Sequence, residues 1–444
     1  MSEPAFAEVE RLVGGRVVHA ERQARWRPAW YLDVETDAGL VPIYFRGDRG
    51  LGQGGVYGLE HEAAVLQVLE AHGIPVPHVY GFCDDPRGIV MQRSPGRANL
   101  ATADDDAQRA AVLDHYIEIL LEMHRIDPAA FEAVGLHMPK GSAELGLADL
   151  PLWEKSFRQQ KSRPEPLVEF ALGWLKRRVP THRTRANFVA GDSGQFLFEG
   201  DRVTAVLDLE LAFLGDPLAD LAGMRSRDIS EPLGDLSRGF RRYAELSGEP
   251  IDLPVLHYHS VRFALNTPLA VAPLCAHPPP GLNFAQYLGW NLVYGRLPIE
   301  VIAEVEGVEL SPPELPEAEG SEYAPAHSAL VAMLEQGAAS SYEVDTALRV
   351  AQYLREVDRR GPSLLEQDLD EAGALLGRRP AGRAECDAAL EDLATSDPER
   401  HQPELLRYLY RSTLRQESLL RPAMRELSDV EFQRINLDSA GNHA

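Results

Sequence analysis

The sequence predicts an α+β protein in which a β-rich lobe precedes a helical lobe and a C-terminal all-α domain. Residues 16–46 alternate apolar and polar side chains, a pattern typical of strands with one buried face. From about residue 103, apolar residues recur at helical spacing. A proline-rich, acidic segment at 306–325 then precedes a further helical part.

The length of 444 residues exceeds one ordinary hydrophobic core, so two or three domains are expected. We predict a β-rich lobe at 1–95 and a helical lobe at 96–305. An acidic linker at 306–325 and a helical domain at 326–444 follow. The part from residue 306 onward holds 27 acidic residues against 14 arginines.

The β-rich lobe is expected to begin with an antiparallel hairpin over 16–46 that turns at "DAGL". The segment 59–73 has helical spacing and ends on Gly73, a favourable helix stop. Strands return in "IPVPHVYGFCDDPRGIVMQRS", with prolines at edge or entry positions.

The helical lobe is expected to contain helices over 104–127 and 165–179. Between them and later helices lie two short strands, "QFLFEG" and "RVTAVLDLE", joined by Gly200 and Asp201. Helical patterns then continue to about residue 305.

The formal net charge of -24 disfavours a nucleic acid or anionic membrane as partner, because the summed field repels phosphate. Three distant cysteines support neither a disulfide framework nor a thiolate zinc site. No apolar run reaches the roughly 18 residues of a membrane span. With no signal-peptide pattern at its start, the sequence predicts a cytoplasmic protein.

Three motifs point to one family: "AGDSGQF" at 190–196, "AVLDLE" at 205–210 and "GDPLADLAG" at 215–223. Together with the order of lobes, they resemble the aminoglycoside phosphotransferase-like family, in the branch similar to the phosphotransferase domains of acyl-CoA dehydrogenase-type proteins. The resemblance covers roughly residues 10–300 and implies a two-lobed protein-kinase-like fold followed by the C-terminal all-α domain. It also implies that the lobe at 1–95 binds nucleotide and that the lobe at 96–305 is the catalytic and substrate lobe.

The resemblance also implies roles for five polar residues. Asp192 would accept the proton of the attacking hydroxyl. Asp208 would bind magnesium, with Glu210 and Gln195 as further ligands. Asp220 would brace the catalytic loop by accepting backbone N–H bonds. For Asp208 and Glu210, capping and hydrating a strand end is the alternative.

The catalytic loop departs from the family pattern in two ways. Ala190 stands where the family has His, and the loop is two residues short. Gln195 therefore replaces the usual Asn, and its additional methylene would partly compensate for the shorter loop.

The resemblance also implies a phosphate-binding cation, usually a lysine, and because no lysine precedes Lys140, that role can fall only to another cation. Arg46 occupies the place of the family's lysine, and Glu62 is its expected partner, with Glu60 as a competitor. An ordinary surface charge pair is the alternative for Arg46 and Glu62.

Two further segments would contact the nucleotide. Arg22, Arg25 and Arg27 make the tip around "AERQARWRPAW" basic, although a solvated loop explains them equally well. The backbone from Met91 to Arg93 would hydrogen-bond adenine at the junction of the lobes.

The predicted function is ATP-dependent, magnesium-requiring transfer of the γ-phosphoryl group to a hydroxyl of a small molecule. An acyl-type metabolite and a cationic aminoglycoside both remain open as acceptors, and the apolar stretch at 262–296 would wall the substrate cleft unless it is core. The alternative of another class is a catalytically weakened scaffold that binds nucleotide or a partner. A homodimer through the C-terminal domain also remains open.

Overall fold

The computed structural model describes residues 6–23, 27–48, 56–318, 320–338 and 341–438. The chain forms two compact units. The first unit comprises Met1–Ala148, Thr181–Asp252 and Gln433–Ala444, and the second comprises Asp149–Pro180 and Leu253–Phe432.

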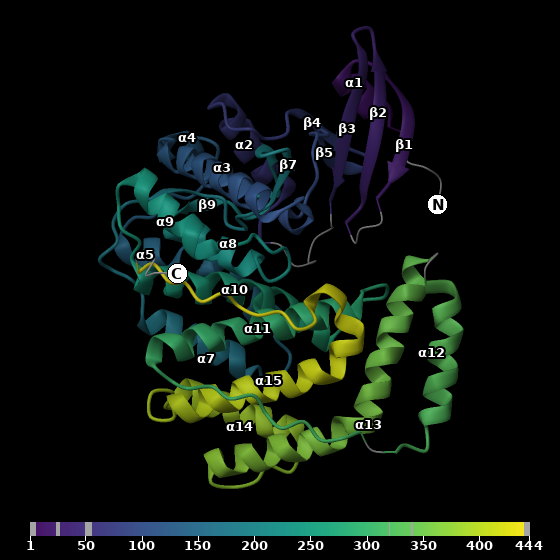
Figure 1. The fold of residues 1–444 in the computed structure, drawn as a ribbon, viewed down its shortest axis with the longest axis vertical. Helices are drawn as coiled ribbons and strands as arrows, with labels where there is room; N and C mark the ends of the chain where they lie inside the picture. The colour runs from purple at the N-terminus through teal and green to yellow at the C-terminus, as the bar shows by residue number, and fades with distance from the viewer. Residues whose placement is uncertain (1–5, 24–26, 49–55, 319, 339–340, 439–444) are drawn as a thin grey trace. The chain divides into compact units, whose positions relative to one another are not determined.

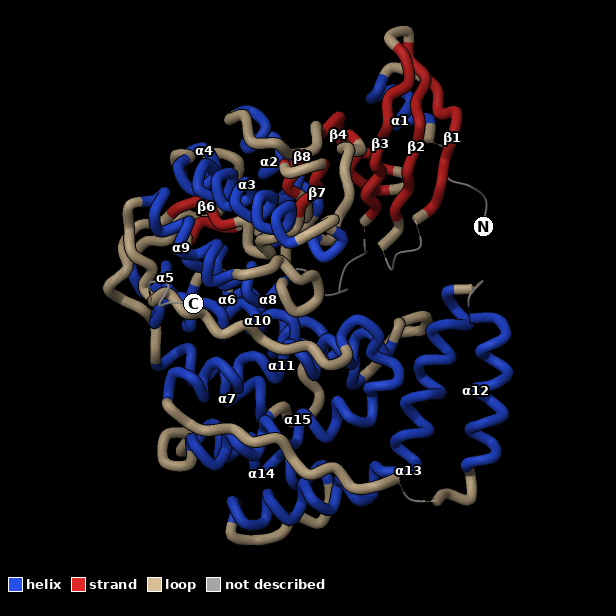
Figure 2. Tube along the Cα trace, in the orientation of Figure 1, coloured by secondary structure: helices blue, strands red, loops and turns tan. Residues whose placement is uncertain are grey.

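The first unit begins with a five-stranded antiparallel sheet (Figure 2). Its strands, in spatial order, are β1 (Arg16–Arg22), β2 (Ala29–Thr36), β3 (Gly39–Gly47), β5 (Arg87–Gln92) and β4 (Val79–Asp84). The predicted turn at "DAGL" joins β2 to β3. The run before it contains two strands rather than one, because the chain reverses direction between them and β1 pairs antiparallel with β2.

The core of this sheet is made by the inward-facing residues that the alternating pattern predicts. Val34, Ile43, Phe45 and Val90 are fully buried, and the short helix α1 (Ala7–Val13) adds Val9 to the same cluster. Helix α2 (Leu59–Ala71) follows where the sequence predicts it.

The described remainder of the first unit contains helices (Figure 1), loops and two small antiparallel ribbons, β6–β9 and β7–β8. The ribbons consist of β6 (Asn187–Val189), β7 (Phe196–Glu199), β8 (Arg202–Val206) and β9 (Phe213–Gly215), with the 3-10 turn η2 (Leu209–Leu211) between β8 and β9. The helical segments are η1 (Leu100–Thr102), α3 (Asp106–Arg125), α4 (Pro128–Glu132), α5 (Ser142–Leu147), α8 (Leu218–Arg227) and α9 (Leu236–Ser247). The segments "QFLFEG" and "RVTAVLDLE" form the β7–β8 ribbon, so the predicted hairpin is confirmed.

The described part of the second unit contains helices and loops. Its helical segments are α6 (Leu150–Gln160), α7 (Pro166–Arg177), α10 (Leu253–Ala276), α11 (Phe284–Glu306), α12 (Ala324–Ala338), α13 (Tyr342–Leu376), α14 (Arg383–Ser396), α15 (Gln402–Met424) and η3 (Arg425–Leu427). Helices α10 and α11 pack together, and α15 packs on α11 and α13. Within the described ranges, every helix is too short or too polar to cross a lipid bilayer.

The limits of the two units differ from those of the predicted domains, since the predicted lobe at 96–305 is divided between the units. Residues 149–180 and 253–305 pack with the C-terminal helices, because α10 and α11 bury apolar side chains on much of their surface. At the other end, Gln433 belongs to the first unit and donates from Nε2 to Asp228 Oδ2 at 2.6 Å.

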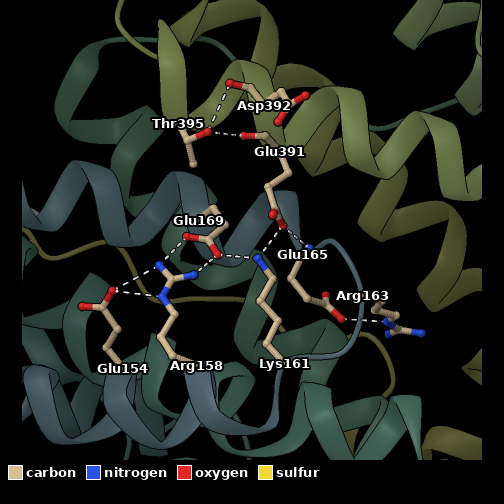
Figure 3. A network of polar contacts seen from close by, with 9 residues as sticks. All are labelled: Glu154, Arg158, Lys161, Arg163, Glu165, Glu169, Glu391, Asp392 and Thr395. Atoms are coloured by element: carbon tan, nitrogen blue, oxygen red, sulfur yellow. Dashed lines mark hydrogen bonds and ion pairs between the residues drawn. The ribbon is translucent and has the colours of Figure 1, made fainter.

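Ion pairs join the loop between α6 and α7 to α14 in the second unit (Figure 3). Glu391 Oε2 accepts hydrogen bonds from Lys161 Nζ at 2.7 Å and from the Glu165 N–H at 2.6 Å. Lys161 also donates to Glu169 Oε1 at 2.6 Å, and Glu169 pairs with Arg158. The Glu391 carboxylate of α14 therefore binds both the Lys161 ammonium and the backbone of this loop.

We expect Glu391→Ala to lower the free energy of unfolding by about 1–3 kcal/mol, because it leaves the Glu165 N–H and the Lys161 ammonium without their shared acceptor. Denaturant unfolding of the full chain measures this loss. The adjacent Asp392→Ala is the matched control, since the Asp392 side chain is exposed. Equal stability of the two variants would contradict a stabilising role for the loop contacts.

Candidate active site

The segment between β6 and β7 forms a tight loop whose conformation requires glycine. Gly191 has φ +84°, and a Cβ there would lie 2.3 Å from the Leu211 carbonyl oxygen. Gly194 has φ +99°, and its N–H donates to the Tyr116 hydroxyl at 2.8 Å. The shortened loop therefore packs against Leu211 at Gly191 and is bound by Tyr116 at Gly194.

Asp220 in the first turn of α8 binds the backbone of this loop. Its carboxylate is fully buried and accepts hydrogen bonds from the N–H groups of Ala190 and Gly191, each at 3.0 Å. The Ser193 hydroxyl donates to the same carboxylate. These contacts fix the backbone on both sides of Asp192.

A histidine from another element lies at this brace. His124 near the end of α3 is buried and contacts Asp220 Oδ2 through Nε2 at 2.8 Å. Its Nδ1 lies 2.9 Å from the Tyr243 hydroxyl. Ala190, which replaces the family's histidine, is itself buried. His124 of α3 therefore supplies an imidazole to the brace.

Asp192 lies at the loop's centre and is held by two side chains. Gln195 Nε2 donates to Asp192 Oδ2 at 2.7 Å, and Arg227 Nε donates to Oδ1 at 3.1 Å. Arg227 Nη2 completes a two-pronged pair with Oδ2. Burial raises the pKa of Asp192 to about 6, although the Arg227 guanidinium opposes that rise.

Sequence reasoning missed Arg227. The available signal is its position seven residues after Asp220 on the same helix, which puts both side chains on one face. Since Asp220 was expected to brace the loop, a second polar residue two turns along could have been expected near Asp192.

Asp208 and Glu210 follow β8, where the chain leaves the ribbon. Asp208 adopts a left-handed conformation with φ +57°, which is unusual for a residue with a side chain. Arg46 Nη2 binds Asp208 Oδ1 and lies 3.1 Å from Glu210 Oε2. The structure thus brings the predicted cation to the predicted metal ligands.

The expected pair of Arg46 and Glu62 is also present. Arg46 Nε and Glu62 Oε2 form a buried ion pair at 2.7 Å, outside hydrogen-bond geometry. The competitor Glu60 instead pairs with Arg87. The surface-pair interpretation is wrong for Arg46 and Glu62, because both side chains are buried.

The charged groups around Arg46 lie close together and are partly buried, and both effects shift the pKa values of Glu62 and Arg46. Burial raises the pKa of Glu62 to about 7, while Arg46 acts in the opposite direction. Burial alone would lower the pKa of Arg46, but the carboxylates of Asp208, Glu62 and Glu210 outweigh it and raise that pKa well above its ordinary value. Arg46 is therefore a permanent cation.

The basic tip between β1 and β2 contributes one residue to the cluster. Arg27 is buried, and its Nη2 donates to Glu210 Oε2 at 2.5 Å. Arg22 lies over the Trp30 ring instead, 6.0 Å from its centroid. Arg25 lies outside the described residues.

The cluster fits magnesium in donor chemistry. Asp208 and Glu210 present carboxylates that are 31% and 22% exposed, and carboxylate and amide oxygens are the ligands that magnesium prefers. In the described residues, no three His, Cys, Asp or Glu side chains are arranged around a cation site. The Arg46 guanidinium lies among the carboxylates instead, so a metal would have to share or displace its contacts.

The predicted adenine-binding segment is largely engaged within the sheet. The N–H groups of Gln92 and Arg93 donate to His78 O at 2.8 Å and Pro42 O at 3.0 Å. The Arg93 side chain pairs with Asp33 at 3.0 Å, and Met91 is buried in β5. An adenine contact here therefore has to use groups other than these two N–H donors.

The stretch at 262–296 forms much of α10 and α11 in the second unit, and most of its residues are buried. Part of it lines a cavity of about 210 Å³. Its apolar walls include Pro268, Leu288 and Leu292, and the charged residues at its edge include Asp387 of α14.

Asp387 makes the stability of the second unit dependent on pH. Burial raises its pKa to about 6, against about 3.9 in an unfolded chain, so the folded protein binds this proton more tightly. The stabilisation is complete at low pH and is lost as the pH rises through about 6. We expect Asp387→Asn to raise the free energy of unfolding by about 1–2 kcal/mol at pH 7.5 and to change it little at pH 4.

Denaturant titrations at the two pH values measure this difference. Asp392→Asn, at an exposed position of the same helix, is the matched control and should leave both values unchanged. A stability gain for Asp387→Asn that is equal at both pH values would contradict the titration.

Residues 58–255 match the phosphotransferase enzyme family (APH). Among curated proteins, acyl-CoA dehydrogenase family member 10 of Mus musculus is 27% identical over 183 residues, and family member 11 of Homo sapiens is 27% identical over 176 residues. Each match covers 37% of this chain but only 16% and 22% of those proteins.

Solved structures show the same fold. A Ralstonia eutropha protein assigned to the aminoglycoside phosphotransferases has a TM-score of 0.51 at 19% identity, over 66% of this chain and 94% of its own. A thermostable mutant of aminoglycoside phosphotransferase APH(4)-Ia has a TM-score of 0.51 at 16% identity, over 68% of this chain and all of its own. The predicted fold class is therefore confirmed.

Proposed function

Because residues 58–255 match the phosphotransferase family and the chain has the fold of its kinase-like members, we propose that this protein transfers the γ-phosphoryl group of ATP to a hydroxyl of a small molecule. The single observation that supports this most is the convergence in one unit of Asp192, the Asp208–Glu210 pair and Arg46. Phosphoryl transfer needs few other groups, since it depends on positioning and charge neutralisation.

In this proposal Asp192 orients the acceptor hydroxyl and takes its proton. Arg46 and Arg27 bind phosphate oxygens when they exchange their carboxylate partners for the nucleotide. Asp208, Glu210 and the Gln195 amide oxygen would hold magnesium, which supplies neutralisation of phosphate charge when bound. The Gln195 amide suits this dual position, because its nitrogen binds Asp192 and leaves its oxygen on the opposite side.

The alternative is a scaffold that binds nucleotide or a partner without efficient turnover. The observation that favours it is the set of ion pairs that Arg46, Arg27 and Arg227 make with the predicted functional carboxylates. Each pair must open or be shared for the carboxylate to act. We further propose an acyl-type metabolite or an aminoglycoside as the acceptor, and a homodimer through the C-terminal helices.

Calorimetry with magnesium ATP tests the nucleotide site. Asp208→Asn should weaken magnesium-dependent binding of ATP by at least about 10-fold, because a charged ligand becomes a neutral amide. Asp201→Asn, at the exposed β7–β8 turn, should bind like the parent. Absence of nucleotide binding by the parent would contradict both functions that use this site.

Turnover of a panel of hydroxylated compounds then separates the two functions. Phosphorylation of any member supports the transferase. Binding of ATP without release or transfer of phosphate across the panel supports the scaffold.

A further inference from the structure

Arg227 ends helix α8 and holds the Asp192 carboxylate with a two-pronged contact. Both side chains are 17% exposed, so the pair is largely removed from water. A guanidinium with two N–H groups on one carboxylate fixes the plane of that carboxylate as well as its charge. Arg227 therefore constrains the orientation of the group that would meet the acceptor hydroxyl.

The donors divide unequally between the two carboxylate oxygens. Asp192 Oδ2 accepts from Arg227 Nη2 and from Gln195 Nε2, the latter at 2.7 Å. Asp192 Oδ1 accepts one hydrogen bond from the described residues, from Arg227 Nε at 3.1 Å. Since each carboxylate oxygen has about two lone-pair positions, Oδ2 is saturated and Oδ1 retains one.

The same helix also fixes the loop backbone. Asp220, two turns earlier on α8, accepts the N–H groups of Ala190 and Gly191. Gly223, between them, lies so close that a Cβ would be 2.4 Å from the Gly191 carbonyl oxygen. One rigid element thus sets both the backbone of the loop and the side chain of Asp192.

We propose that Arg227 is a positioning residue of the phosphoryl-transfer site, which fixes Asp192 so that Oδ1 accepts the acceptor hydroxyl's proton. This inference rests on the proposed function. The O–H bond of the acceptor breaks, its oxygen bonds to the γ-phosphorus, ADP leaves with the electron pair of the broken P–O bond, and the proton stays on Asp192 until it is released to solvent. Arg227 contacts neither nucleotide nor acceptor in this scheme.

Steady-state phosphate release from ATP, together with transfer to any acceptor found in the panel, tests the role of Arg227. Arg227→Met should lower kcat about 100-fold, because small misplacements of a reacting group cost about that much. The KM and Kd for ATP should stay within about twofold of the parent, since Arg227 does not touch the nucleotide. Arg227→Lys should recover about 10-fold of the loss, because one contact returns without the fork.

A matched control is Arg242→Met on α9, which removes a surface arginine that pairs with Glu118 at 3.2 Å and with Glu245 at 3.8 Å. It should leave kcat and KM unchanged. An unchanged kcat in Arg227→Met would overturn the inference. A rise of 10-fold or more in the Kd for ATP would also overturn it, by making Arg227 a phosphate ligand.

Crystal structures of the parent and Arg227→Met test the inference independently of turnover. The carboxylate of Asp192 should rotate and lose its Gln195 contact in the variant, while Asp220 keeps its two backbone contacts. An Asp192 carboxylate that stays in place without Arg227 would refute the positioning role. A parent that binds no ATP would refute the proposed function, and the carboxylate orientation would still decide whether Arg227 positions Asp192.

Discussion

Asp192→Asn is expected to lower the rate of phosphoryl transfer by about 10³-fold while magnesium ATP still binds. The substitution keeps the size of the side chain but removes the proton acceptor, and general-base contributions are typically about 10²–10⁴-fold. Asn also matches its neighbours poorly, because its own N–H₂ would face either Arg227 or Gln195, which both donate to this position. Phosphate release and calorimetry on the same preparation measure both quantities.

The control for Asp192→Asn is Asp201→Asn, which makes the same chemical change in the exposed turn between β7 and β8. It should change neither rate nor affinity. If Asp192→Asn kept the parent's turnover, another group would have to accept the proton, and the assignment of the loop would be wrong. If the variant also lost nucleotide binding, the ion pair of Asp192 with Arg227 would be maintaining the nucleotide site itself.

Some residues of the site could be predicted from the sequence, because short stretches of the chain indicate them. Asp208 and Asp220 stand in a continuous motif, so their spacing along the chain is informative. The pairing of Arg46 with Glu62 followed from the absence of any lysine before Lys140, which left few cations for the strand. Arg46 and Glu62 lie on the consecutive elements β3 and α2.

Features that depend on distant segments could not be predicted in the same way. Arg227 meets Asp192 across 35 positions of the chain, and only the turn of α8 against the loop joins them. Gly191 is required by the Leu211 carbonyl, which no local pattern reveals. The division into units depends on which helix faces meet, and α10 is apolar on too many sides to indicate its neighbours.

The largest loss of stability is expected from Asp220→Ala. The buried carboxylate accepts two backbone N–H bonds and the Ser193 hydroxyl, and it contacts the His124 ring. Removing it leaves several buried polar groups without their partner, which typically costs about 3–5 kcal/mol. Denaturant unfolding measures the loss, and phosphate release should fall with it because the loop around Asp192 is no longer held.

Asp235→Ala provides the comparison for Asp220→Ala, since Asp235 caps α9 through one bond from the Arg238 N–H at 3.0 Å. Loss of one exposed cap costs about 1 kcal/mol, so the two variants should differ by about 2–4 kcal/mol. Equal losses would mean that Asp220 acts as an ordinary helix-terminal residue. The loop would then depend on Gly191 and Gly194 for its shape, and α8 would no longer be the element that couples the loop backbone to Arg227.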